Sequence, residues 1–177
     1  MKNFKTFGLM AFAALSLMLT SCSSDSDGGS TGPNGSNLDT YVNAKVDGVN
    51  FETFSIQGVS LGTASRDGSF VTVTGISKAS ATAMEQKMIT IALMDVTGPG
   101  TYTLNANTNA GVVSYFESGT NKSWDSGNCD AGTATVIVTT FNDTKIEGTF
   151  TLTGADSDNC SSVKNVTNGS FRGTFMN

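Results

Sequence analysis

The chain lacks the side chains that most enzymes use for proton transfer at neutral pH. It contains no histidine, which is the commonest general base and a frequent metal ligand. Catalysis would therefore need paired carboxylates, but the glutamates Glu52, Glu85, Glu117 and Glu147 lie on separate predicted segments. Nucleophile elbow, phosphate-loop and metalloprotease motifs are also missing from the sequence. We expect a protein that is not an enzyme and that uses no cofactor.

Two of the three cysteines, Cys129 and Cys160, have the spacing of a structural disulfide. Residues 133–141 and 145–153 predict a hairpin that turns at residues 142–143, and this hairpin would bring both cysteines to its open end, within a few residues of register. The alternative is a metal or redox site, but two thiols without histidine or a Cys-x-x-Cys spacing suit neither use. We predict a disulfide that closes a loop of about 32 residues and contributes roughly 3 to 4 kcal/mol of stability by loop-closure entropy.

Carboxylates gather around these two cysteines. Asp125 and Asp130 flank Cys129, and Asp156 and Asp158 precede Cys160. A disulfide would bring these loops together, so the four carboxylates could offer the hard oxygen ligands that calcium prefers. Alternatively, the sequence holds no metal site, because Asp, Asn, Ser and Gly are also the usual residues of turns and neither loop has the spacing of an EF-hand.

Three aromatic residues are candidate ligand contacts. Trp124, Tyr115 and Phe116 lie in or beside the loop-rich stretch 112–130. Exposed aromatic rings stack on sugars, whereas buried rings supply core area, and the sequence leaves both roles open.

The N-terminal residues 1–21 predict a signal peptide. Two lysines in the first five residues precede the apolar segment 7–19, which is too short to span a bilayer as a permanent helix. The next residues, Leu19-Thr20-Ser21-Cys22, resemble the lipobox of bacterial lipoproteins, in which the cysteine thiol receives a diacylglyceryl group. This resemblance implies that the mature chain begins at Cys22 and is held at a membrane by two or three acyl chains. The alternative is an ordinary secretory signal with an incidental cysteine.

Residues 22–39 predict a lipidated cysteine followed by a flexible tether. The tether is rich in Ser, Gly, Asp and Asn and has a single large apolar residue, Leu38, so it cannot offset its ordering entropy by burial. Its first residues, Ser23-Ser24-Asp25-Ser26-Asp27, resemble the acidic export signal of surface-displayed lipoproteins of the Bacteroidota. An acidic, serine-rich linker would also contain such a run by composition alone.

Residues 40–177 predict a single all-β domain. Alternation with period 2 is clearest in residues 145–153, where Ile146, Phe150 and Leu152 share one face and charged or hydroxyl side chains share the other. Tight-turn pairs separate the stretches, among them Asp47-Gly48. We predict an antiparallel β-sandwich or a partly closed β-barrel of about nine strands. The expected strands are 41–47, 49–56, 70–76, 87–94, 100–104, 112–117, 133–141, 145–153 and 166–176.

Two segments have less regular patterns. Thr82 and Glu85 have the spacing of a capping box, so residues 80–88 predict at most two turns of helix, or else a longer loop. Residues 133–141 carry apolar side chains on both faces, Ile137 among them, so we expect a central strand that is covered on both sides.

Several strand and turn phrases resemble small lipoproteins of the Bacteroidota whose domain has no known function. The phrases are Val46-Asp47-Gly48-Val49-Asn50-Phe51, Gly100-Thr101-Tyr102-Thr103-Leu104, Ile146-Glu147-Gly148-Thr149-Phe150 and Val166-Thr167-Asn168-Gly169-Ser170-Phe171. The resemblance covers most of the mature chain, and the phrases contain no active-site motif. The resemblance implies an outer-membrane location and no mechanism.

We expect an outer-membrane lipoprotein, periplasmic or surface-exposed, with a monomeric, non-catalytic β domain that binds a glycan or another envelope component. Loss of residues 1–21 removes two lysines and changes the net charge from −5 to −7, which opposes binding to nucleic acid. One alternative is a structural or adhesive protein that meets a protein partner along a sheet edge. Another is a small-molecule or lipid carrier with an open apolar interior.

Overall fold

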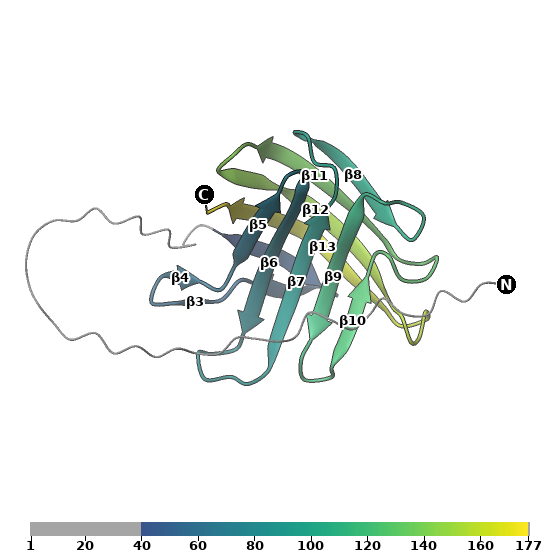
Figure 1. Ribbon diagram of the computed structural model, residues 1–177. Coiled ribbons are helices and arrows are strands. Elements are labelled where there is room, and N and C mark those ends of the chain that lie inside the picture. The colour runs from purple at the N-terminus through teal and green to yellow at the C-terminus, as the bar shows by residue number, and fades with distance from the viewer. Residues whose placement is uncertain (1–39, 177) are drawn as a thin grey trace, which may run out of the picture. The chain divides into compact units, whose positions relative to one another are not determined.

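The domain consists of β-strands, as predicted. The computed structural model describes residues 40–176, which form thirteen strands and contain no helix (Figure 1). The additional strands are mainly short ones in segments whose alternation is too brief to be recognised in the sequence. The strands are β1 (Tyr41–Val46), β2 (Val49–Glu52), β3 (Ser55–Ile56), β4 (Val59–Ser60), β5 (Thr63–Asp67), β6 (Phe70–Lys78), β7 (Gln86–Leu93), β8 (Gly100–Asn105), β9 (Gly111–Glu117), β10 (Lys122–Asp125), β11 (Thr133–Phe141), β12 (Lys145–Asp156) and β13 (Val163–Thr174).

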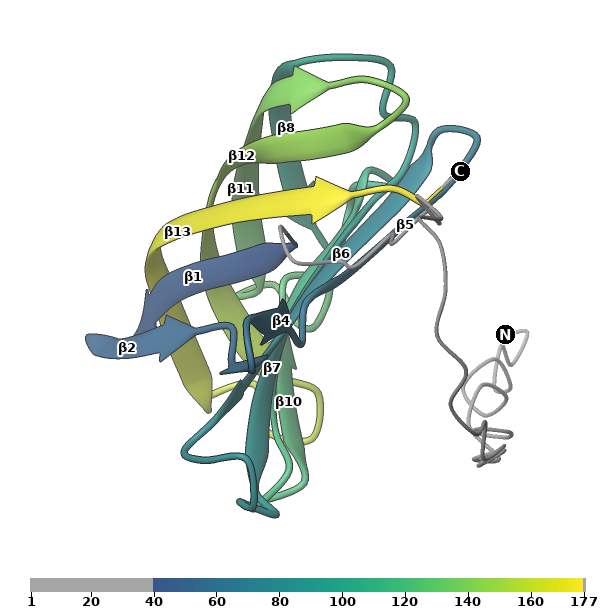
Figure 2. The ribbon, with the colours of Figure 1, turned by 90° about the vertical axis from the view of Figure 1, so that its left-hand side faces the viewer.

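Eleven of these strands form one antiparallel sheet that folds into two layers, whereas β3 and β4 form a separate small hairpin. Figure 2 shows a layer of β2, β1, β13, β12, β11 and β8 beside a layer of β5, β6, β7, β9 and β10. The long strand β12 joins them, because it pairs with β11 and β13 over most of its length and with β10 at its end. Each of β2, β5 and β8 has a single neighbour, so the sheet is an open sandwich and does not close into a barrel.

The chain also crosses between the layers directly after β2. Thr53 Oγ1 accepts a hydrogen bond from the Val42 amide in one layer, and the Phe54 amide donates to the Ile76 carbonyl in the other, each at 2.8 Å. Gly75 makes this approach possible, because a Cβ there would lie closer than 3.0 Å to side-chain atoms of Thr53 and Val42. The two layers are therefore held close on this side as well.

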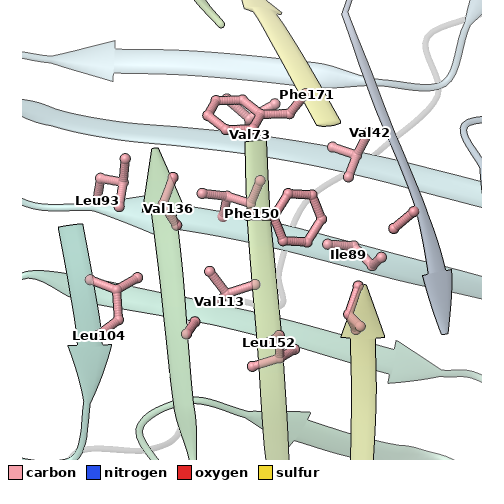
Figure 3. Packing of buried hydrophobic residues seen from close by; sticks show 14 of the residues in the cluster. Val42, Val73, Ile89, Leu93, Leu104, Val113, Val136, Phe150, Leu152 and Phe171 are labelled. Atoms are coloured by element: carbon pink, nitrogen blue, oxygen red, sulfur yellow. The ribbon is translucent and has the colours of Figure 1, made fainter. Parts of the chain in front are cut away.

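Side chains from both layers fill the interior (Figure 3). The predicted inward face of β12 is confirmed, since Ile146, Phe150 and Leu152 are all buried. In β7 the buried residues also alternate, as do those of β11. No buried side-chain nitrogen or oxygen in residues 40–176 lacks a hydrogen-bond partner. The main favourable contribution to the free energy of folding is the burial of apolar surface, at about 25 cal/mol per Å².

One open local prediction is decided, and another was wrong. Of the two alternatives for residues 80–88, the loop is present up to the start of β7, because β7 pairs with β6 from Gln86 onward and two isolated helical turns are marginal in water. Ile137 is 44% exposed, so β11 is covered on one face only. This strand has neighbours on both edges, β12 and β8, but the second layer covers a single side of it.

The predicted disulfide is present between Cys129 and Cys160, with their Cα atoms 5.9 Å apart. The hairpin on which the prediction rests is also present, because Phe141 pairs with Ile146 and the Asn142 amide donates to the Lys145 carbonyl. The bond joins the segment that follows β10 to the one that follows β12.

Candidate functional site

Three adjoining hollows form a groove at one end of the sandwich, between the β1–β2 turn and the ends of β6, β7 and β9. Their volumes are about 510, 480 and 110 Å³. The first two share Asn50, Ser77 and Lys78, and the last two share Asn50, Lys87 and Glu117. We call the region lined by these five residues and their neighbours in the hollows the polar groove.

Polar residues enter the groove by continuing the inward-facing stripes of three core strands. Ser77 follows the buried positions of β6, Lys87 precedes those of β7 and Glu117 follows those of β9. The strand register then places Ser77 opposite Lys87, and Lys87 opposite Glu117. The groove is therefore the end of the interlayer space, where polar side chains replace the apolar ones.

The β1–β2 turn forms the opposite wall. Asp47 and Gly48 both have positive φ angles, of 47° and 84°, which suits the two-residue turn that the Asp-Gly pair predicts. The Asp47 carboxylate accepts a hydrogen bond from the Asn165 amide at 3.0 Å and pairs with Lys164 at 3.0 Å. The backbone hydrogen bond from Asn165 lowers the pKa of Asp47, and Lys164 lowers it further against the opposing effect of burial. The turn is thus attached to β13 by an ionised carboxylate.

Tyr115 forms part of the groove floor. The ring is buried, and its hydroxyl donates a hydrogen bond to Glu117 Oε1 at 2.7 Å. Burial raises the pKa of Tyr115 far above its ordinary value, and the neighbouring Glu117 carboxylate raises it further. The phenol is therefore a permanent hydrogen-bond donor, and it occupies one acceptor atom of Glu117.

Trp124 lies beneath this floor. Its ring stacks on Tyr115 with centroids 5.9 Å apart, and Nε1 donates to Ser162 Oγ at 2.9 Å. Lys164 Nζ lies 5.4 Å from the ring centroid. The three predicted aromatic contacts are therefore packed side chains: Trp124 and Tyr115 are buried, and Phe116 is half-buried on the alternate face of β9. Of the three, Tyr115 lines the groove.

The four calcium candidates stabilise turns or face solvent. Asp125 accepts hydrogen bonds from the Gly127 amide and from Asn128 Nδ2, and burial raises its pKa. Asp156 is buried, pairs with Lys122 at 3.5 Å and accepts the Asp158 amide. In the described residues, no group of three or more His, Cys, Asp or Glu side chains is arranged to hold a metal ion. The side chains of Asp130 and Asp158 are exposed.

Another hollow, of about 660 Å³, lies beside β5 and the end of β13. Its cation Arg66 is already used, because it pairs with Asp143 at 3.1 Å and its guanidinium lies 4.7 Å from the centroid of the Phe141 ring. We therefore regard the polar groove as the better candidate site.

Sequence reasoning missed Asn50, Ser77, Lys78 and Lys87. A signal for two of them exists in the strand pattern, since Ser77 and Lys87 occupy positions that alternation assigns to the core. A charged residue at such a position, at the end of a strand, indicates that the two layers separate there.

Comparison with known proteins found no similar family model, curated protein or solved structure. The resemblance to lipoproteins of the Bacteroidota therefore stays a prediction. Residues 40–176 contain no helix that is long and apolar enough to cross a membrane. The signal peptide, Cys22 and the tether all lie outside the described residues.

Proposed function

We propose that the protein is an outer-membrane lipoprotein, acylated at Cys22, whose β domain is a non-catalytic module that binds a glycan in the polar groove. The lipobox-like sequence supports the membrane anchor. The groove is the observation that carries the binding role, because its three hollows adjoin and together suit an elongated ligand.

The groove residues have the chemistry of hydroxyl recognition. Asn50 and Gln86 carry amides that both donate and accept, and Ser77 and Thr120 carry hydroxyls that do the same. Because the faces of Tyr115 and the tryptophan are covered, recognition would depend on hydrogen bonds and charges instead of on stacking. A hydroxyl-rich ligand satisfies such a surface.

One wall of the groove lies away from Thr40. The proposed anchor segment joins the domain at Thr40, whose Oγ1 accepts a hydrogen bond from the Thr174 amide. The turn at Asp47 is at the other end of β1, about 20 Å away for a strand of this length. The attachment point and the groove wall are thus at opposite ends of one strand.

The packed interior gives no support to the carrier alternative, because side chains such as Phe150, Leu152 and Phe171 occupy the space between the layers (Figure 3). A protein partner along a sheet edge is best accommodated at β8, which pairs only with β11 and has no charged side chain. The experiment below separates this partner from a glycan.

The test uses the full chain, purified in detergent, on an array of envelope and dietary glycans. Ser77→Arg would fill the groove where two hollows meet, so we expect it to lose most glycan retention. The matched control is Thr72→Arg, on the same strand but on its alternate, outward face. Circular dichroism would check that both variants fold.

Equal glycan retention by Ser77→Arg and the wild-type chain would contradict the proposal, as would the absence of any retained glycan. A protein that is recovered from native envelopes equally well by both would instead indicate a protein partner that binds outside the groove.

A further inference from the structure

The polar groove contains two lysines that have no carboxylate partner. Residues 40–176 include eight basic and twelve acidic side chains. Five of the basic residues pair with a carboxylate within 4.0 Å. In this described part of the chain, Lys45, Lys78 and Lys87 form no such pair, and the last two line the groove. Two of the three unpaired lysines of this part of the chain therefore line the groove.

These two lysines lie where the hollows meet. Lys78 ends β6, is half-buried and lines the first and second hollows. Lys87 lines the second and third. Each hollow of the groove therefore has at least one of the two lysines in its wall, so a chain that lies along the groove would pass both residues.

Two carboxylates of the groove, those of Glu117 and Asp47, form hydrogen bonds or ion pairs with other residues. Lys87 is directly opposite Glu117 in the strand register, but Glu117 accepts hydrogen bonds from Tyr115 at 2.7 Å and from Thr120 at 3.5 Å. Asp47 is held by Lys164 and by a backbone amide.

The remaining acids of the groove, Glu52 and Glu85, are exposed, and each lines a single hollow. The two lysines each line two hollows, as Glu117 does. Among the basic residues that line the three hollows, Lys78 and Lys87 are thus the two without a carboxylate within 4.0 Å.

We infer that the groove binds an anionic polysaccharide, with Lys78 and Lys87 each contacting a carboxylate or sulfate group on successive parts of the chain. This inference rests on the proposed function and adds the charge of the ligand. An ammonium group has three donors and no acceptor, and its hydrogen bonds to anions are stronger than those to neutral hydroxyls. A neutral glycan would not form these stronger hydrogen bonds.

The experiment compares glycans of equal length that differ in charge. Galacturonate oligomers, sulfated galactose oligomers and neutral galactose oligomers are titrated into the full chain in detergent, and Trp124 fluorescence is followed because this single tryptophan stacks beneath the groove floor. We expect at least about tenfold tighter binding of one anionic series than of the neutral series, with a smaller difference as salt rises from about 20 to about 300 mM. Preference for galacturonate or for the sulfated series identifies the anion.

Substitutions distinguish the effect of the two groove lysines from the effect of the domain's overall charge. The double variant Lys78→Gln/Lys87→Gln should lose about tenfold in affinity for the preferred anionic glycan, so that its preference for the anionic over the neutral series disappears. Lys45→Gln is the matched control, since Lys45 is also unpaired but lies outside the groove; it should bind as the wild-type chain does.

Four results would overturn the inference. Equal affinity for neutral and anionic glycans, or an unchanged double variant, would refute it and leave glycan binding in the groove intact. Tighter, lysine-dependent binding of polyglutamate than of any glycan would show that the ligand is an acidic peptide. Failure of all glycans to bind would refute the inference and the proposed function together.

Discussion

At the scale of single residues, a few polar contacts hold the groove in shape. Asp47 connects the β1–β2 turn to β13, and Lys164 connects that turn to the face of Trp124. Tyr115 keeps its proton and directs it to Glu117, which leaves the opposite lysine free. The groove walls are thus positioned by groups that do not themselves need to touch a ligand.

The lowered pKa of Asp47 predicts a pH-dependent stability. A carboxyl group whose pKa is lower in the folded than in the unfolded chain stabilises the fold above its unfolded pKa, and the stabilisation disappears as the pH falls through the folded value. We expect Asp47→Asn to lower the melting temperature at neutral pH and to have a smaller effect near about pH 2, because protonation of Asp47 removes its stabilising charge as the pH falls. Thermal unfolding at both pH values measures this, and an equal difference at the two would contradict it.

At the scale of elements, β12 organises the domain. It pairs along its length with β11 and β13 and reaches β10 through the pair of Trp124 and Asp156 (Figure 1). The layers can therefore lie apart at the groove and still be joined at β12. Cys129 and Cys160 add a covalent link just beyond the ends of β10 and β12.

The disulfide should account for part of the stability of this junction. We expect Cys129→Ser/Cys160→Ser to lower the free energy of unfolding by about 3 to 4 kcal/mol, because the open loop regains its entropy in the unfolded chain. Urea unfolding of the variant and of the wild-type chain measures the difference, and wild-type protein treated with a reductant should match the variant. Two alkylatable thiols in the native exported protein would show that the bond does not form in the cell.

At the scale of the whole molecule, β1 connects the first described residue to the groove. Thr40 precedes one end of β1, and the turn at Asp47, which lines the third hollow, follows the other end. The first hollow lies closer to the start of β1, because Thr53, which lines it, accepts a hydrogen bond from the Val42 amide.

The anchor is tested by acylation of Cys22. We expect labelled fatty acid to enter the full chain, and Cys22→Ala to lose the label and to be released from envelopes, since two or more acyl chains are needed for stable attachment. Ser24→Ala is the control, because it changes a nearby residue that the lipobox does not include. A Cys22→Ala chain that stays attached to envelopes would contradict the proposed location.

The sequence by itself determined the all-β class, the inward face of β12, the Asp47-Gly48 turn and the disulfide. All four follow from local rules, namely period-2 alternation, turn preferences and the register of one short hairpin.

Only the tertiary structure decided which neighbours each strand has and where the layers part. Burial of Trp124 and exposure of Ile137 depend on whether a second layer covers a given face, which no local pattern contains. Lys78 and Lys87 line the same hollow as Asn50 because the long-range pairing of other strands brings β2 into contact with β6. The groove is a consequence of long-range register, and therefore it was not visible in the sequence.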